Sequence, residues 1–427
     1  MKRFASITAG IFIITAMSLS CGKTPLKPHY TATDSVLLYV KETMDRMYLW
    51  QDKMTRVEWR DYTNPARMLA DMVYLPVDKW SNVYEQTRLK SFLTGEATGY
   101  GFMPAWEGNE LMVASVYTDT EAHRKGLRRG YRIALINGRM PQGMYSWDFF
   151  NTPLLGETIS LVAVGTQDTL RISISANTVT NDYVLHREVI SVSGKKCGYV
   201  VYESFTEDSK QAIVAAMEDF RVLGISELII DLRYNGGGET SVLMSWMSKI
   251  LPARLSGKPF FITRHNAKVS YLNKADKVFP NATSLGMERV FVISSQRTAS
   301  ASEALINCLK PYIEVHHIGD RTHGKPVGMY VYDFKGWYVV PISFEYTNIK
   351  GEGGFYDGIL PEQYAYDDKS LDWGNPNDPC LAQAIHYIKH EAYQPTILST
   401  RLKSSRPDIV PLPPLGLYTL MPNQLSK

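Results

Sequence analysis

Two apolar stretches, each followed by a loop of small residues and then by a helical pattern, constrain the fold most strongly. Residues 227–240 read ELIIDLRYNGGGET, and residues 289–309 read RVFVISSQRTASASEALINCL. Uninterrupted apolar runs are typical of strands buried on both faces, and such strands alternate with helices in layered α/β folds. Residues 198–202 (strand-like) and 209–223 (amphipathic) continue the alternation. The sequence therefore predicts an α/β core over residues 185–393.

The region before this core has a helical pattern. Val36, Leu37 and Val40 begin a series of apolar residues at the spacing of one helix face, within residues 34–94. We expect residues 22–94 to form a linker and a mainly helical N-terminal region.

Residues 95–180 predict a β-rich domain instead. Several strand-like segments surround one short helix, and Asn137-Gly138 is typical of a tight hairpin turn. The chain is thus expected to be an α/β multidomain protein, and the prolines in residues 394–427 predict an extended tail.

The first residues have the character of a secretory signal. Lys2 and Arg3 precede an apolar stretch over residues 7–19, which is short for a membrane span. Because Cys21 follows small residues, we expect residues 1–21 to be a lipoprotein signal peptide and Cys21 to carry the lipid. Ordinary cleavage and an uncleaved anchor are the alternatives.

This anchor predicts a place in the cell envelope. Gly22, rather than Asp, follows Cys21, and this favours the outer membrane with the protein facing the periplasm. The net charge of +3 is small and the basic residues are scattered, so nucleic acid is not an expected partner. The sequence has no H-E-x-x-H pattern or C-x-x-C pair, and we expect no metal and no cofactor.

The serine-rich turn supplies a candidate nucleophile. Ser300 stands where a buried strand turns into a helix, and helix N-terminal amides favour a developing negative charge. However, Ser-x-x-Glu is also a capping box, with Ser300 as cap and Glu303 reaching back. From this motif alone, a plain helix cap is the stronger interpretation.

Two further loops carry candidate residues. The three glycines after residues 227–231 can turn backbone amides towards a site, although a plain turn is equally consistent. Their spacing matches neither a dinucleotide loop nor a phosphate loop. Asp231 and Arg233 are expected to fix this loop by an ion pair or hydrogen bonds. Lys325, between Gly324 and Pro326, would by itself be interpreted as a solvated loop lysine.

Together, the three motifs resemble those of the C-terminal processing (tail-specific) serine peptidase family. That family has a D-L-R-x-N-x-G-G-type loop, a nucleophile in S-A-S-E and a lysine in a G-K turn, in this order. Here 25 residues separate Ser300 from Lys325, as in the family, and the resemblance covers about residues 35–390. It implies a PDZ domain followed by a ClpP/crotonase-like core, with Ser300 as nucleophile and Lys325 as general base.

The resemblance implies further sites. The amides of Ala301 and of Gly238 or Gly237 would hold the oxyanion. Residues 95–180 would be the PDZ-like domain, with Gly101 and Phe102 in its peptide-binding loop. The expected substrates are proteins or peptides with accessible C-termini, cut at or near those regions by an endopeptidase.

One departure from the family concerns the lysine. Many members place a Gln four residues after it, where the amide orients the amine, but this chain has Met329. Thr322, His323 and Gln296 are candidates for that role. The departure keeps a second hypothesis open, a catalytically weak, PDZ-type peptide-binding lipoprotein. A third, acyl-thioester chemistry on a crotonase-like core, leaves Ser300 and Lys325 unexplained.

Overall fold

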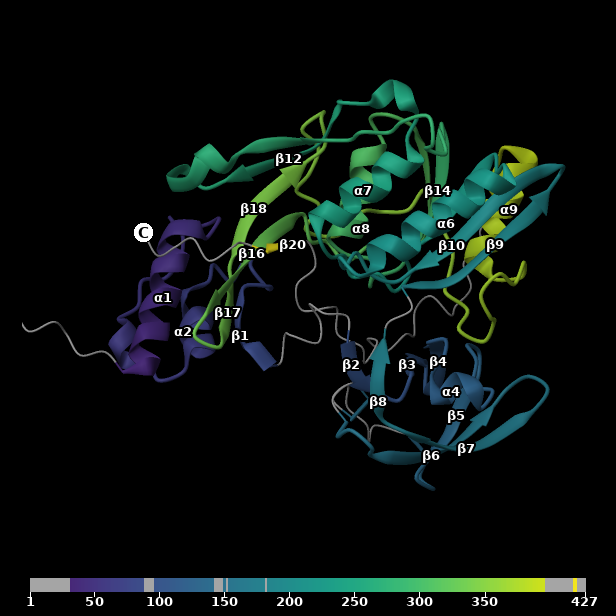
Figure 1. Ribbon diagram of the computed structural model, residues 1–427, viewed down its shortest axis with the longest axis horizontal. Helices are drawn as coiled ribbons and strands as arrows, with labels where there is room; N and C mark the ends of the chain where they lie inside the picture. The colour runs from purple at the N-terminus through teal and green to yellow at the C-terminus, as the bar shows by residue number, and fades with distance from the viewer. Residues whose placement is uncertain are drawn as a thin grey trace, which may run out of the picture.

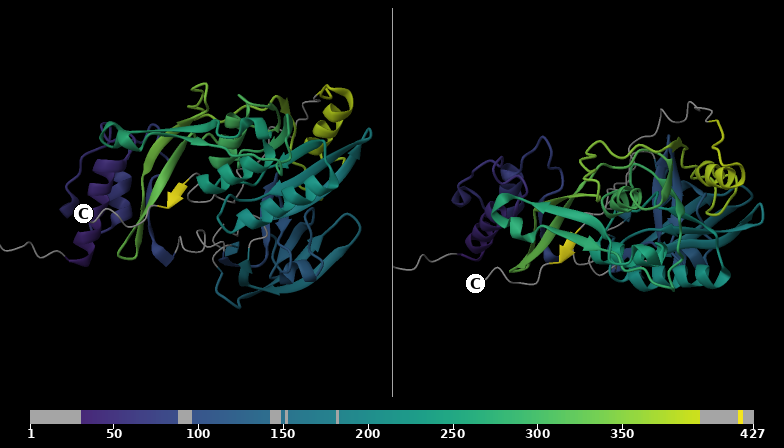
Figure 2. Two further views of the ribbon diagram at one scale, coloured as in Figure 1. Left: turned by 45° about the horizontal axis from the view of Figure 1, so that its top comes forward. Right: turned by 90° about the horizontal axis from the view of Figure 1, so that it is seen from above.

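The computed structural model describes residues 31–87, 96–141, 149–150, 153–180, 183–395 and 418–420. These ranges contain helices and several sheets, which confirms the predicted mixed α/β class. The N-terminal helices lie at one end of the molecule and the helix α9 lies at the other (Figure 1, Figure 2). No helix in the described ranges is long and apolar enough to cross a membrane.

The central sheet has the strand order β19-β15-β14-β11-β10-β9. All its neighbouring strands are parallel except β9, which is antiparallel to β10. The strands are β9 Val184–Val192, β10 Lys195–Tyr202, β11 Glu227–Asp231, β14 Arg289–Ser294, β15 Glu314–Gly319 and β19 Gln363–Tyr364. β11 and β14 are the two apolar stretches of the sequence, and their central position explains why they lack polar alternation.

Helices cover both faces of this sheet. Ile229 and Phe291 point to the face that Leu381 of α9 covers. Their neighbours Ile230 and Val292 point to the opposite face, where they join a larger cluster with the other three helices. The helices are α6 Ser209–Leu223, α7 Thr240–Ile250, α8 Ala301–Leu309 and α9 Pro379–His390. Successive strand residues thus serve two separate cores.

A second sheet, with antiparallel main strands, joins the N-terminal region to the core. Its main order is β1-β17-β16-β18-β12-β13, and β20 pairs in parallel with β16. The strands are β1 Asn82–Glu85, β12 Pro259–His265, β13 Lys274–Lys277, β16 Val327–Phe334, β17 Trp337–Val340, β18 Ile342–Thr347 and β20 Tyr418–Leu420. The mainly helical expectation for residues 34–94 is therefore wrong for residues 82–85, because these pair with β17.

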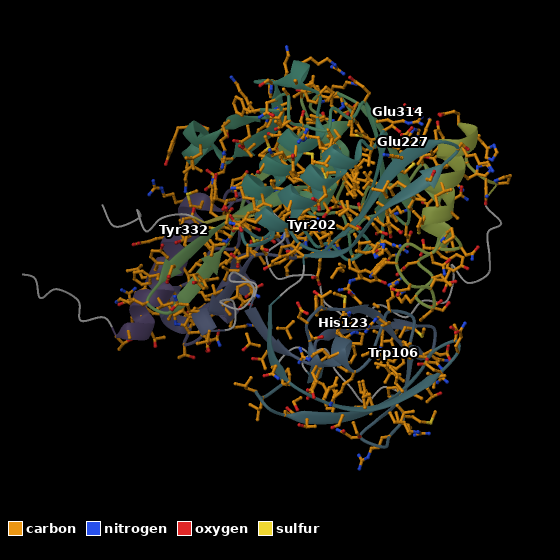
Figure 3. All side chains as sticks on the ribbon, turned by 45° about the vertical axis from the view of Figure 1, so that its right-hand side comes forward. Trp106, His123, Tyr202, Glu227, Glu314 and Tyr332 are labelled. Carbon is orange, nitrogen blue, oxygen red and sulfur yellow. The ribbon has the colours of Figure 1, made fainter. Side chains whose placement is uncertain are left out.

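The N-terminal helices are those the apolar spacing predicts. α1 Ala32–Met47 buries Val36, Leu37 and Val40, and α2 Pro65–Met72 packs beside it. Both join the main core cluster, which extends from these helices to α6, α7 and α8. Tyr332 of β16 lies towards this end of the molecule (Figure 3).

Residues 96–141, 149–150 and 153–180 form a module with a core of its own. Five of its strands form one sheet in the order β3-β4-β5-β6-β7, and it contains the short helix α4 Glu121–Arg124. The strands are β3 Phe102–Glu107, β4 Glu110–Val116, β5 Arg132–Ile136, β6 Thr158–Val164 and β7 Thr169–Ser175, with a separate pair β2 Glu96–Gly99 and β8 Asn177–Thr180. Asn137 and Gly138 both have positive φ, as the predicted tight turn requires. Trp106 and His123 mark this module in Figure 3.

A buried arginine fastens the glycine loop to the core. Arg233 is 1% exposed and contacts three carboxylates, those of Asp231, Asp367 and Asp378, at 2.7, 2.8 and 2.8 Å. The predicted ion pair between Asp231 and Arg233 is thereby confirmed. Arg129 of the β-rich module shares Asp367 with Arg233, so the same cluster also contacts that module.

Replacing this arginine is expected to destabilise the fold. Arg233→Met leaves the buried carboxylates of Asp231 and Asp378 without their cation, at a cost of about 3 to 5 kcal/mol in the free energy of unfolding. Urea denaturation followed by circular dichroism measures the change. Arg221→Met is the control, because Arg221 pairs with Glu218 on the exposed face of α6 and should leave the denaturation midpoint unchanged. Equal midpoints for both variants would contradict the assigned role.

Candidate active site

Ser300 lies where a buried strand turns into a helix. β14 ends at Ser294 and α8 begins at Ala301, so the loop between them places Ser300 at the helix N-terminus. Its backbone has φ 58° and ψ −106°, a conformation that costs a non-glycine residue about 1 to 3 kcal/mol. Strain of this kind persists only where neighbouring contacts enforce it, and it is concentrated at functional sites.

The contacts that enforce the strain come from the glycine loop. The Ala299 N–H and the Ser302 hydroxyl both donate to the Asn235 carbonyl oxygen, at 3.1 Å each. A Cβ built on Gly237 would lie 2.9 Å from the Ala301 nitrogen and 3.1 Å from the Ser300 Cβ. Only a glycine leaves room for this approach, so the two loops touch directly at Ser300.

The Glu303 carboxylate joins the serine turn to the lysine turn. Oε2 accepts the N–H groups of Ser300 and Lys325 at 2.7 and 2.8 Å. Oε1 accepts the Gly324 N–H and the Thr322 hydroxyl, both at 2.6 Å. Glu303 therefore reaches back to Ser300 as the capping box predicts, and it holds the lysine turn as well. The same carboxylate therefore caps the helix and positions the candidate catalytic residues, so the two interpretations of this motif do not exclude each other.

Burial shifts the pKa values of Glu303 and Lys325 in opposite directions. Desolvation raises the pKa of the Glu303 carboxyl, although its four hydrogen bonds oppose the rise. Desolvation lowers the pKa of Lys325 from 10.5 to about 7, against the attraction of the Asp78 and Glu303 carboxylates. Lys325 is 3% exposed, so it is far from the solvated lysine that its loop position alone suggests.

The glycine loop offers backbone donors beside Ser300. The Gly237 N–H donates to Asn235 Oδ1 at 2.9 Å and is thus already engaged. Within the described residues, no acceptor takes the N–H of Gly238 or that of Ala301. Gly238 has φ 148°, and its Cα packs against the Phe205 backbone so closely that no side chain fits. Of the three expected oxyanion donors, Gly238 and Ala301 are the more available.

Three side chains were candidates to orient the lysine. The Thr322 hydroxyl donates to Glu303 and accepts the Ile359 N–H at 2.7 Å, so it is fully used. Gln296 donates to Asp320 at 3.0 Å. His323 stays beside the lysine, where burial first and then the Lys325 charge lower the pKa of its imidazole to about 4.

The residues just before β1 lie at the lysine, although no role for them was predicted from the sequence. Trp80 lies with its ring centroid 5.6 Å from Lys325 Nζ, and its indole N–H faces His323 Nε2 at 3.4 Å. Asp78 is buried and acts electrostatically on Lys325. No motif marks this segment, and an acidic residue among aromatic neighbours was the only available signal.

The remaining expected residues lie elsewhere. Gly101, with φ 83°, and Phe102 stand at the start of β3 in the β-rich module, separate from Ser300. A hollow near Gly101 is lined partly by Thr120 and Arg124. Cys21 lies outside the described residues. Met329 is fully buried on β16, in the main core cluster.

Residues 196–364 match the family model "Peptidase family S41", a range that contains the glycine loop, Ser300 and Lys325. A "Probable CtpA-like serine protease" of Staphylococcus epidermidis is 19% identical over 355 residues, covering 81% of this chain and 67% of that protein. Its namesake in Staphylococcus aureus is 22% identical over 271 residues, covering 60% of this chain and 51% of that protein. The chain thus spans about half the length of the latter.

Solved structures share the fold. A Bacteroides fragilis protein whose name assigns it to the S41 proteases superposes with a TM-score of 0.71 at 21% identity, covering 85% of this chain and 98% of its own. The photosystem II D1 C-terminal processing protease superposes with a TM-score of 0.51 at 20% identity, covering 80% and 95%. These findings confirm the resemblance to C-terminal processing peptidases for the core: residues 196–364 form a peptidase family S41 domain.

Proposed function

We propose that this protein is a serine endopeptidase in which Ser300 is the nucleophile and Lys325 the general base. The observation that carries the proposal is the link between a buried lysine and a strained serine through Glu303. Burial lowers the pKa of Lys325 to about 7, so a large fraction of this amine is neutral near neutral pH. A neutral amine at this position can accept a proton, as a general base must.

The reaction then follows from the placement of these groups. Lys325 takes the Ser300 proton while Oγ bonds to the scissile carbonyl carbon, and the new oxyanion accepts hydrogen bonds from the amides of Gly238 and Ala301. Collapse of this intermediate breaks the C–N bond, and the Lys325 ammonium gives its proton to the leaving amine. Water attacks the acyl-enzyme with the same assistance, which releases a carboxylate and restores Ser300.

The sheet that contains β16 has a strand edge close to Lys325 where an extended polypeptide fits. β17 and β18 pair with one edge of β16, and the chain's own β20 pairs in parallel with the other edge at Met329–Val331. β16 begins two residues after Lys325, so an extended segment at this edge lies near the lysine. This supports a peptide substrate bound by strand addition.

The β-rich module supports a preference for chain ends. Among the described strands, β3 pairs with β4 alone and thus lies at the edge of its sheet, and Gly101 precedes it, as the PDZ interpretation requires. We propose that this module captures substrate C-termini. Pro104 interrupts the donors of this edge, because proline has no N–H, so a captured peptide would form a short ladder.

The runner-up is a catalytically weak, PDZ-type peptide-binding lipoprotein. Met329, which cannot replace the orienting amide of relatives, is the observation that favours it. Against it, a protein that only binds peptides gains nothing from a strained Ser300 or from burying Lys325. Binding without cleavage by the intact chain would support this alternative.

Mutual dependence of the two residues tests the dyad. Ser300→Ala and Lys325→Ala should each lower the cleavage rate of an unfolded protein by roughly 10³-fold or more. The double variant should be little slower than either single variant, because the two residues act as one unit. Rates are measured from fragment formation. Additive losses would mean that the residues act independently.

The pH dependence tests the identity of the base. Activity should rise with pH through about 7, because raising the pH above the pKa of Lys325 increases the neutral amine. Burial holds the pKa of His323 at about 4, so that imidazole is neutral throughout this range. His323→Gln should therefore keep the rising limb in kcat/KM profiles. Loss of the limb in this variant would assign the base to the histidine.

We further propose that the protein is anchored in the cell envelope by a lipid on Cys21, facing the periplasm from the outer membrane. Cys21→Ala should then move the protein from the membrane pellet to the soluble fraction of lysed cells, while the purified soluble form keeps its activity. A variant that still sediments with membranes would point to a different anchor.

A further inference from the structure

A buried carboxylate from the N-terminal region lies beside the lysine pocket. Asp78, 2% exposed, precedes β1, and its Oδ1 accepts the N–H groups of Trp80 and Ser81 at 2.9 and 3.0 Å. The other oxygen, Oδ2, is buried without a hydrogen bond of normal geometry among the described residues, although the Tyr48 hydroxyl lies close to this carboxylate. A buried carboxylate oxygen without such a bond is costly, so a group that uses it is to be expected.

Lys325 is the cation on which the Asp78 carboxylate acts. Trp80, two residues after Asp78, lies over the lysine amine at 5.6 Å, so the segment that carries the carboxylate also covers the amine. The segment is held in place because the Ser81 hydroxyl accepts the Ile342 N–H of β18 at 2.8 Å. The Asp78 carboxylate acts electrostatically on Lys325, and the burial of both groups strengthens this attraction.

We propose that Asp78 is a positioning residue for Lys325, whose carboxylate directs the amine and stabilises the ammonium that forms when Ser300 gives up its proton. The proposal rests on the peptidase function and supplies the orienting group that Met329 does not. The carboxylate plays the part that an acidic residue plays towards a catalytic histidine. The proton moves from Ser300 to Lys325 and then to the leaving amine.

The other groups around the amine are already engaged or uncharged. The two carboxylate oxygens of Glu303 already accept four hydrogen bonds. The Tyr346 hydroxyl donates to the Ser300 carbonyl oxygen at 3.0 Å. Asp78 is therefore the remaining acidic group that can stabilise the ammonium form of Lys325.

The nearby titratable groups keep their charge state across neutral pH. Burial first, and then nearby carboxylates, raise the pKa values of Tyr48, Tyr346 and Tyr356 above their usual range. Burial and nearby lysines, including the exposed Lys79, lower the pKa of His323 to about 4. A limb near neutral pH that responds to Asp78 therefore reports on Lys325.

Asp78→Asn is the sharp test, because it removes the charge and keeps an oxygen for the Trp80 and Ser81 amides. A carboxylate within a few ångströms raises a lysine pKa, so its loss should move the rising limb of the kcat/KM profile to lower pH by about one unit. The plateau should fall roughly tenfold or more, because the ammonium loses its counter-charge. Asp78→Glu should bring the limb back towards that of the parent.

Asp71→Asn is the matched control, since it removes a partly exposed carboxylate, paired with Arg67, from the same region. It should leave limb and plateau unchanged. A lower plateau with an unmoved limb in Asp78→Asn would make Asp78 a structural residue only, and this result overturns the proposal. An unchanged plateau and limb would overturn it as well.

A second measurement separates this inference from the proposed function. In the Ser300→Ala background, the rate at which acetic anhydride modifies Lys325 is followed against pH by peptide mass mapping, with and without Asp78→Asn. The half-maximal pH should fall by about one unit when the charge is removed, and an unmoved value overturns the inference. If it falls although the parent chain cleaves nothing in a Ser300-dependent way, the peptidase function fails while the Asp78–Lys325 coupling stands.

Discussion

The buried carboxylate of Glu303 is the interaction on which the candidate site depends. It satisfies the amides of two turns that are more than 20 residues apart in the chain, and each of its oxygens serves two donors. Four such bonds offset the cost of burying the carboxylate, and they allow few positions for either turn. Ser300 can therefore keep a strained backbone, because relaxing it would break contacts on both sides.

The same burial sets the chemistry of the lysine. A dry pocket favours the neutral amine, but each carboxylate near it favours the ammonium, so the pKa of Lys325 settles near 7 instead of falling further. In this pocket the exclusion of water lowers the pKa of Lys325, and the nearby carboxylates raise it. Two side chains of the glycine loop hold it in place: Arg233 pairs with buried carboxylates, and the Asn235 amide accepts the Gly237 N–H and donates to the Tyr202 carbonyl oxygen.

Much of this architecture follows from local patterns in the sequence. The apolar runs of β11 and β14 predicted buried strands in a layered α/β core, and the spacing around Val36 predicted α1. Glu303 was predicted only as a helix cap, because its second set of partners is 19 to 22 residues away and no spacing rule reaches that far. β1 was missed since four residues show little periodicity, and their strand conformation depends on pairing with β17, more than 250 residues later.

The position of Asp78 and Trp80 shows why the S41 domain is only part of the site. The matched range begins at residue 196, yet the ring and the carboxylate that face Lys325 come from a segment more than 100 residues before it. That segment reaches the pocket because β1 extends the sheet that contains β16. Strand pairing thus brings residues that are distant in the sequence to Lys325. The N-terminal helices bury their apolar faces in the core that includes β16 and β18, and they thereby stabilise the strand that brings Trp80 over the amine. In a core without this region, water would reach Lys325 and raise the pKa of its amine. The amine would then be protonated near neutral pH and could not accept the Ser300 proton.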